Sequence, residues 1–112
     1  MKNISSQDTY DHLQRQDCIL VDVREVAEYK EESIPGSILL PLSHFSLQDY
    51  QDLDVGKKTL IIHCRSGVRS QQVCHALLEA HFSSTVFNLK GGILAWKQEG
   101  FPTHIPIGLQ KA

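Results

Sequence analysis

Residues 59–81 read TLIIHCRSGVRSQQVCHALLEAH, and this stretch decides the fold. Its first part, Thr59–His63, is a run of apolar and β-branched residues, which is typical of a strand buried on both faces. Residues 70–81 predict a helix, because apolar side chains recur on one face at helical spacing. The side chains that share this face are Val73, Leu77 and Ala80, with Ala76 beside them. The stretch therefore predicts a strand, a short loop and a helix in direct succession.

The rest of the chain continues this alternation. Further strands are expected over residues 18–23, 38–40 and 85–89. The remaining helices are expected from a cap at Ser5 to about Gln16, weakly over residues 25–30, over residues 43–51 and over residues 93–99. Strands that alternate with helices over short loops predict an α/β fold with a mainly parallel sheet, covered by helices on both faces. Neither a linker nor a repeat divides the sequence, so residues 1–112 are predicted to form a single domain.

Composition and charge exclude several classes of protein. With 112 residues, a net charge of −2 and a pI near 6.3, the chain has no basic surface of the kind that binds nucleic acid. No segment approaches the roughly 20 apolar residues of a spanning helix, so neither export nor membrane insertion is expected. We expect a cytoplasmic protein. Its three widely spaced cysteines fit neither a disulfide framework nor a zinc site, and we predict no metal and no cofactor.

The loop after the central strand carries the predicted chemistry. Cys64 follows the strand and lies close to the start of a helix, where free backbone N–H groups and two arginines, Arg65 and Arg69, favour a thiolate. Gly67 allows the backbone to turn its N–H groups inward as a cradle for an anion. Cys64 is therefore the predicted catalytic nucleophile. The predicted substrate-binding residues are Arg65, Ser66, Gly67, Val68, Arg69 and Ser70.

Two charged residues at the carboxyl end of the neighbouring strand are predicted to support this loop. Asp22 and Arg24 are expected to orient Arg69, or each other, beneath it; the alternative is a weak surface ion pair. Ile93 and Trp96 lie at helical spacing and are expected to pack in the core. The same role is expected for Cys18 and Cys74, with a reaction at Cys64 as the alternative for either thiol. His63 is expected to point away from Cys64, because adjacent strand residues face opposite sides.

These motifs resemble those of rhodanese domains, in family order and over most of the chain. The matching pieces are Asp22-Val23-Arg24-Glu25 with Glu28-Tyr29, Ile34-Pro35-Gly36-Ser37, Cys64-Arg65-Ser66-Gly67-Val68-Arg69-Ser70, and Leu89-Lys90-Gly91-Gly92-Ile93 with Ala95-Trp96. The resemblance implies a five-stranded parallel sheet and a sulfurtransferase in which Cys64 carries sulfur as a persulfide. The implied donor is thiosulfate, a small anion, or a protein persulfide, and the acceptor is a thiol, cyanide or a carrier protein.

The sequence departs from the family pattern at two places. Glu32 and Ser33 stand where Gly-His usually precedes the Ile-Pro-Gly segment, and His81-Phe82 stands where Gly-Phe is common. Neither departure falls in the predicted catalytic loop. The departure at Glu32 and Ser33 affects instead the expected contacts with a substrate or partner near Ser33.

Two alternatives to sulfur transfer stay open. The loop resembles the cysteine phosphatase signature, but four residues separate Cys64 from Arg69, where that signature has five. A shorter loop makes a smaller cradle, which suits one sulfur atom better than a tetrahedral phosphate. A small-pocket phosphatase or arsenate reductase is the first alternative. A noncatalytic sulfur carrier or partner-binding module is the second, because a carrier needs the same cysteine loop.

Overall fold

The computed structural model of the chain describes residues 1–106. It contains a five-stranded parallel sheet in the order β1-β5-β4-β2-β3, which confirms the predicted α/β class. The strands are β1 (Lys2–Ile4), β2 (Cys18–Asp22), β3 (Ile38–Leu39), β4 (Thr59–His63) and β5 (Val86–Leu89). The predicted single domain runs to residue 112, and its last six residues lie outside this described part.

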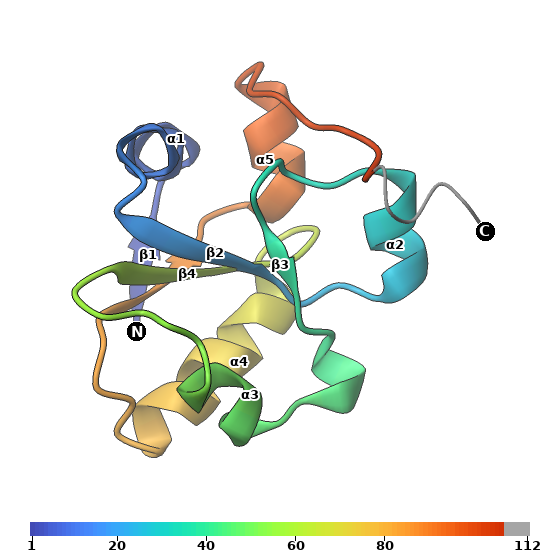
Figure 1. Cartoon of the computed structure of the whole chain (residues 1–112). Coiled ribbons are helices and arrows are strands. Elements are labelled where there is room, and N and C mark those ends of the chain that lie inside the picture. Colours follow the sequence, from blue (N-terminus) through green and yellow to red (C-terminus); the bar gives the residue numbers. More distant parts are fainter. Residues whose placement is uncertain (107–112) are drawn as a thin grey trace.

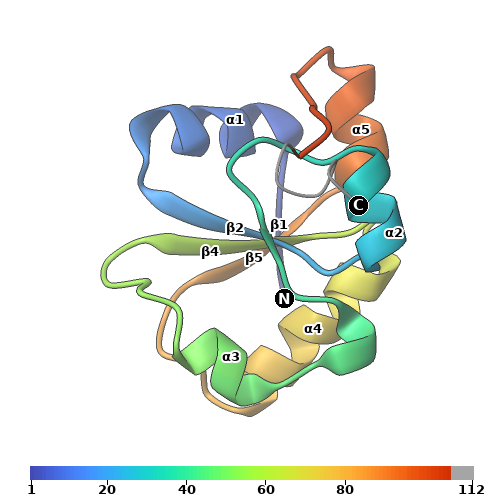
Figure 2. The same ribbon diagram turned by 45° about the vertical axis from the view of Figure 1, so that its right-hand side comes forward.

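Helices cover both faces of the sheet (Figures 1 and 2). One face carries α1 (Ser6–Arg15) and α5 (Gly92–Gln98), and the opposite face carries α3 (Leu47–Gln51) and α4 (Val68–Glu79). The short helix α2 (Val26–Glu31) lies beyond the carboxyl end of β2. Because β4 leads directly into α4, the loop between them lies at this same end of the sheet. No helix within residues 1–106 is long and apolar enough to cross a membrane.

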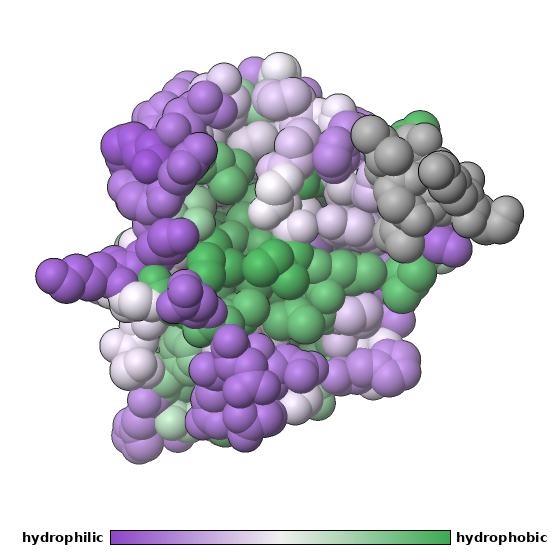
Figure 3. Space-filling model, viewed as in Figure 1, coloured by the Kyte–Doolittle hydropathy of each residue, from purple (hydrophilic) through white to green (hydrophobic). Residues whose placement is uncertain are grey.

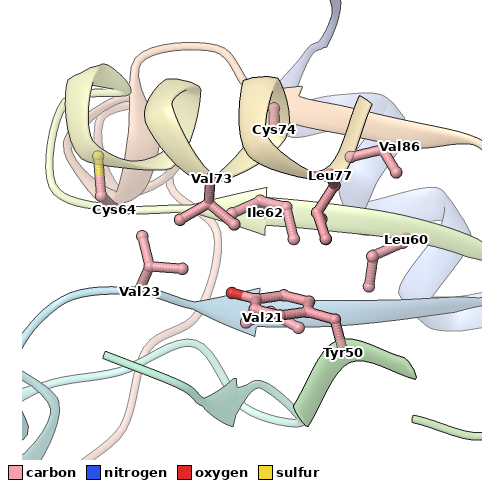
Figure 4. Close-up of a cluster of buried hydrophobic side chains, with 10 residues drawn as sticks. All are labelled: Val21, Val23, Tyr50, Leu60, Ile62, Cys64, Val73, Cys74, Leu77 and Val86. Carbon is pink, nitrogen blue, oxygen red and sulfur yellow. The ribbon is translucent and has the colours of Figure 1, made fainter. Parts of the chain in front are cut away.

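The central strands are buried on both faces, as their continuous apolar sequence predicts. On one side Leu60 and Ile62 pack with Val73 and Leu77 of α4 (Figure 4), whereas Ile61 between them packs toward Trp96 of α5. Each fully buried aliphatic side chain stabilises the fold by about 1.5–3 kcal/mol. The strand that precedes Cys64 is therefore held by apolar packing on both of its faces.

The first turn of α1 is capped as the sequence predicts. The Ser5 hydroxyl accepts the backbone N–H of Asp8 at 3.0 Å, which satisfies one of the free donors of the helix. Sequence reasoning missed β1, just before this cap, where Ile4 pairs with Leu89 of β5. A strand of only three residues, followed at once by a helix, gives no alternating pattern to recognise.

Two predicted helices differ from the structure by more than one residue at an end. Helix α4 begins at Val68 rather than at residue 70, because Gly67 with φ +106° caps it, and it ends at Glu79. Ala80 terminates the helix and is exposed, so it does not share the buried face, whose apolar members are Val73, Cys74 and Leu77. The helix expected over residues 43–51 is a 3-10 turn, Leu42–His44, followed by the separate α3.

The sheet edge at β3 exposes apolar side chains. Ile38 is 40% exposed and Phe45 nearby is 38% exposed. The apolar surface at the centre of Figure 3 lies over this edge of the sheet. Because β3 has only two residues, it offers few free backbone groups to another strand.

Candidate active site

The Cys64 thiol lies in a cradle of backbone and hydroxyl donors. Gly67 turns the chain so that its own N–H donates to the Cys64 Sγ at 3.0 Å. The Ser70 hydroxyl, one turn into α4, lies 3.4 Å from the same sulfur. Cys64 is only 1% exposed, so these groups, rather than water molecules, supply the hydrogen bonds to its sulfur. The predicted anion cradle is thus built around the sulfur itself.

This environment lowers the pKa of Cys64 below its ordinary value. Burial alone raises the pKa, because it disfavours the charged form. The Ser70 hydroxyl and the backbone N–H groups of Ser70, Gly67 and Ser66 outweigh burial by hydrogen bonding to the sulfur. From the sequence, a large share of this effect is expected from the two arginines, Arg65 and Arg69. The leading contributions come instead from hydrogen bonds, which the position of the cysteine at a helix start predicts.

The six predicted substrate-binding residues differ in exposure. Gly67 and Ser70 are buried against the thiol, and Arg69 is half-buried. Arg65 and Ser66 are exposed, and Val68 is 63% exposed with its side chain in solvent. Any role of Val68 at the thiol therefore falls to its backbone, and its part in substrate binding stays a prediction.

Arg69 is held by Glu28, a residue of the quoted Glu28-Tyr29 motif to which the sequence assigned no role in the site. Its guanidinium donates to the two carboxylate oxygens of Glu28 at 2.7 and 3.0 Å. Both side chains are about one-third exposed. The hydrogen bonds from Arg69 lower the pKa of Glu28 to about 2. The ion pair holds the Arg69 side chain in one position and links α2 to α4.

Asp22 and Arg24 pair with each other, which is one of the two arrangements that the sequence predicts, and within residues 1–106 no hydrogen bond joins either of them to Arg69. Arg24 Nη2 donates to Asp22 Oδ2 at 2.8 Å, and both side chains are almost fully buried, so this is no surface pair. Arg24 Nη2 also donates to the Glu32 carbonyl at 2.7 Å. Removing one partner of such a buried pair lowers the free energy of unfolding by about 3–5 kcal/mol, because the other charge stays buried without a partner.

His63 lies behind the loop and is completely buried. Its Nδ1 is 3.3 Å from the Cys64 carbonyl oxygen, and its Nε2 is 3.6 Å from Asp22 Oδ2. Burial lowers the pKa of His63, which keeps the ring neutral. His63 thus contacts the backbone of Cys64 and not its thiol, in agreement with the expectation that it points away from Cys64.

The segment after β5 holds the loop from the other side. Ile93 N–H donates to the Cys64 carbonyl at 2.9 Å, and Leu94 N–H donates to the Arg65 carbonyl at 3.1 Å. This approach requires Gly92, since a Cβ there would lie 2.4 Å from the Cys64 carbonyl oxygen. Trp96 is 1% exposed in the core, as expected.

Asn88, at the end of β5, is a second buried residue that sequence reasoning missed. Its Oδ1 accepts the Ser70 hydroxyl at 2.5 Å, and its Nδ2 lies 3.4 Å from the Gly67 carbonyl oxygen. The available signal was its position, a polar residue in an apolar strand that ends beside the loop. Asn88 therefore contacts two of the residues that surround the thiol.

A groove of about 680 Å³ opens beside the loop, between α2, α5 and the segment that follows α5. Its lining includes Arg24, Glu28, Glu32, Arg65, Leu94 and Lys97. Glu32 accepts hydrogen bonds from Lys97 and from Thr103, and the backbone of Ser33 pairs with that of His104. Glu32, which stands in place of the usual Gly, is thus part of the groove wall. Ser33, in place of the usual His, supports that wall through its backbone.

The other cysteines differ from Cys64 in environment. Burial raises the pKa of Cys18 to about 11 and that of Cys74 to about 12. All three thiols are free. Within residues 1–106, no group of three His, Cys, Asp or Glu side chains is placed to hold a metal ion. Cys64 is thus the cysteine with the activating environment.

Comparisons with known proteins agree with this geometry. A family model described as a rhodanese-like domain matches residues 5–99. A protein named sulfurtransferase from Allochromatium vinosum is 38% identical over 96 residues, 83% of this chain and 84% of that protein. Thiosulfate sulfurtransferase GlpE from Coxiella burnetii is 33% identical over 96 residues, covering 86% of this chain and 87% of that protein. The crystal structure of a rhodanese-related protein from Thermoplasma volcanium matches with a TM-score of 0.80 at 27% identity, over 95% of this chain and 100% of the other.

Proposed function

The chain belongs to the rhodanese-like domain family, and from that membership we propose that it is a sulfurtransferase in which Cys64 carries a sulfane sulfur as a persulfide. The observation that carries this proposal is the Cys64 sulfur itself, held by the N–H of Gly67 in a loop of four residues before Arg69. A thiolate in such a site is a nucleophile near neutral pH.

In the first half of the reaction, the Cys64 thiolate attacks the outer sulfur of thiosulfate. A new bond forms between the Cys64 Sγ and this outer sulfur, and the sulfur–sulfur bond of thiosulfate breaks. Sulfite leaves with the electron pair, and Cys64 becomes a persulfide anion. No oxidant is needed, because the sulfane sulfur is transferred without net oxidation.

In the second half, an acceptor such as cyanide or a thiolate attacks the outer sulfur of the persulfide. Thiocyanate or a new persulfide leaves, and the Cys64 thiolate is restored. The inward backbone N–H groups of the loop hold the negative charge in both stages. Hydrogen bonds from backbone groups cost no reorganisation when the charge moves along the two sulfur atoms.

Arg65 is the cation placed to attract the anionic donor. It is exposed, it lines the groove, and no ion pair joins it to another side chain within residues 1–106. Arg69 contributes less, because Glu28 takes both of its terminal amino groups. The groove is large enough for a protein persulfide or an organic thiol, as well as for thiosulfate. Three free cysteines suit a reducing compartment such as the cytoplasm.

Steady-state transfer of sulfur from thiosulfate to cyanide tests the proposal. Cys64→Ser is expected to abolish turnover, because a hydroxyl neither ionises near pH 7 nor forms a persulfide. Cys18→Ser and Cys74→Ser are the matched controls and are expected to retain it. Turnover by Cys64→Ser at the parent rate would refute the assignment of the nucleophile. A parent protein that accepts one sulfur without turning over would be a carrier.

A further inference from the structure

Asn88 presents a fixed orientation to the loop. It is 5% exposed, and its Nδ2 faces two oxygens, the Gly67 carbonyl at 3.4 Å and Asn3 Oδ1 at 3.3 Å. The Gly67 carbonyl can only accept a hydrogen bond, so the amide nitrogen of Asn88 must be the atom that faces it. The Asn88 Oδ1 is then left to face the Ser70 hydroxyl.

Ser70 has one hydroxyl proton and two acceptors within reach. Asn88 Oδ1 lies at 2.5 Å, and the Cys64 Sγ lies at 3.4 Å, an ordinary length for a hydrogen bond to sulfur. A single proton serves only one of them at a time. Both acceptors are buried, so no water replaces the donor for the one that goes without.

We propose that Asn88 is a positioning residue that competes with the Cys64 sulfur for the hydroxyl proton of Ser70. The inference rests on the proposed role of Cys64 as the nucleophile. While Cys64 is a thiol, Ser70 donates to Asn88 and accepts the thiol proton. When the sulfur becomes an anion, the Ser70 hydroxyl rotates toward it, and Asn88 Oδ1 loses its donor. This loss opposes formation of the free thiolate.

The competition is relieved when sulfur is loaded. In the persulfide the charge lies on the outer sulfur, about 2 Å beyond the Sγ, since that is the length of a sulfur–sulfur bond. Ser70 is then free to return its proton to Asn88, while the loop N–H groups hold the outer sulfur. Asn88 therefore favours the loaded cysteine over the free thiolate.

Other charged groups near Cys64 act without passing through Asn88. They are Arg65 next to it in the loop, Arg69 on α4, the Asp22–Arg24 pair at the end of β2, and two titratable neutral groups, His63 on β4 and the Cys74 thiol on α4. On the outer side of Asn88, the charged residues are Met1, at the N-terminus, and Lys90. Within residues 1–106, none of their side chains is hydrogen-bonded to the side chain of Ser70 or of Asn88. Their effect on Cys64 is therefore the same in variants that change only Asn88 or Ser70.

A double-mutant cycle on the titration of Cys64 tests the proposal. The thiolate is followed by its ultraviolet absorbance in the parent, Asn88→Ala, Ser70→Ala and the double variant. Cys18 and Cys74 do not interfere, because burial raises their pKa to about 11 and about 12. Below the pKa of Cys64, Asn88→Ala is expected to raise the thiolate fraction about 2- to 10-fold, the equivalent of one hydrogen bond. Ser70→Ala is expected to lower it.

The decisive comparison is between the two backgrounds. In the Ser70→Ala background, Asn88→Ala is expected to change the thiolate fraction less than about 2-fold, because the Ser70 hydroxyl proton, for which Asn88 and the sulfur compete, is absent. An equal change in both backgrounds would overturn the proposal, since Asn88 would then act through the Gly67 carbonyl. A fall in the thiolate fraction of Asn88→Ala would also overturn it.

Asn88→Leu is a second variant that fills the same space without polar atoms, in case the alanine variant does not fold. The same increase in thiolate is expected. The titration does not involve sulfur transfer, so its result is separate from that of the proposed function. A protein that shows this coupling but never loads sulfur would refute only the proposed function.

Discussion

Arg69 on α4 and Glu28 on α2, 41 residues apart in the sequence, are joined by two hydrogen bonds of 2.7 and 3.0 Å. Glu28 Oε1 also accepts the backbone N–H of Glu25 at 3.0 Å, at the start of α2. One carboxylate therefore stabilises the first turn of α2 and holds an arginine that borders the Cys64 loop. The pair fixes the distance between α2 and α4 at the edge of the site.

Glu28→Gln is expected to lower the free energy of unfolding by less than about 1 kcal/mol at pH 7, because the ion pair is one-third exposed and partly screened. The pKa of Glu28 falls from its ordinary 4.5 to about 2 in the folded protein. Stabilisation by the carboxylate is thus complete above pH 4.5 and is lost as the pH falls through about 2.

Urea unfolding of the parent and Glu28→Gln across this pH range measures the effect. The difference between them is expected to vanish at the acid end. Glu31→Gln, on the exposed side of the same helix, is the control and is expected to change little. A difference between parent and Glu28→Gln that stays constant with pH would contradict the ion pair.

Gly92→Ala is expected to displace the loop that holds Cys64. Its Cβ would lie 2.4 Å from the Cys64 carbonyl oxygen and 2.5 Å from that of Arg65. Gly56→Ala is a matched control, because Gly56 has nearly the same φ, +56° against +59°, and open space around it. The positive φ costs about 1–2 kcal/mol in both variants, and the clash adds about 1–3 kcal/mol in Gly92→Ala alone.

Unfolding in urea and alkylation of Cys64 by iodoacetamide at pH 7 measure these two consequences. Gly92→Ala is expected to be the less stable variant and to react more slowly, because its N–H donors no longer converge on the sulfur. Gly56→Ala is expected to react at the parent rate. Equal stability and reactivity of the two variants would show that close approach at Gly92 does not shape the loop.

Much of this architecture follows from local sequence patterns. The strand before Cys64 and the helix after Gly67 are both read from a few adjacent residues, because their apolar spacing reflects burial. The three residues of β1 could not be found in this way, since they form a strand only by pairing with β5 from the far end of the chain.

The contacts of charged residues were harder to predict than the elements. The sequence leaves open whether Asp22 and Arg24 orient Arg69 or each other, because all three lie at the same end of the sheet. Which acid Arg69 meets depends on the exact placement of α2, and this placement follows from tertiary packing rather than from spacing. The role of Asn88 was hidden for the same reason, because its partners Ser70 and Gly67 belong to another segment.

Loop length is expected to determine which anion the site prefers. Inserting a glycine between Ser66 and Gly67 gives five residues between Cys64 and Arg69 and leaves α4, which begins at Val68, in register. A larger ring of N–H donors is expected to bind phosphate or vanadate at least about 10-fold more tightly than the native loop does, the equivalent of about 1.4 kcal/mol or one hydrogen bond. Calorimetric titration of both proteins measures this. Equal binding by the native loop would instead favour the phosphatase alternative.

The persulfide on Cys64 is the central claim, and intact-protein mass spectrometry after mixing with thiosulfate tests it most directly. The parent protein is expected to gain about 32 Da, the mass of one sulfur atom, and peptide mapping is expected to place the gain on Cys64. Addition of cyanide is expected to remove it. Cys64→Ser is expected to gain nothing, whereas Cys18→Ser and Cys74→Ser gain the same mass as the parent. A parent protein that gains no sulfur, or that gains it on Cys18 or Cys74, would contradict the account.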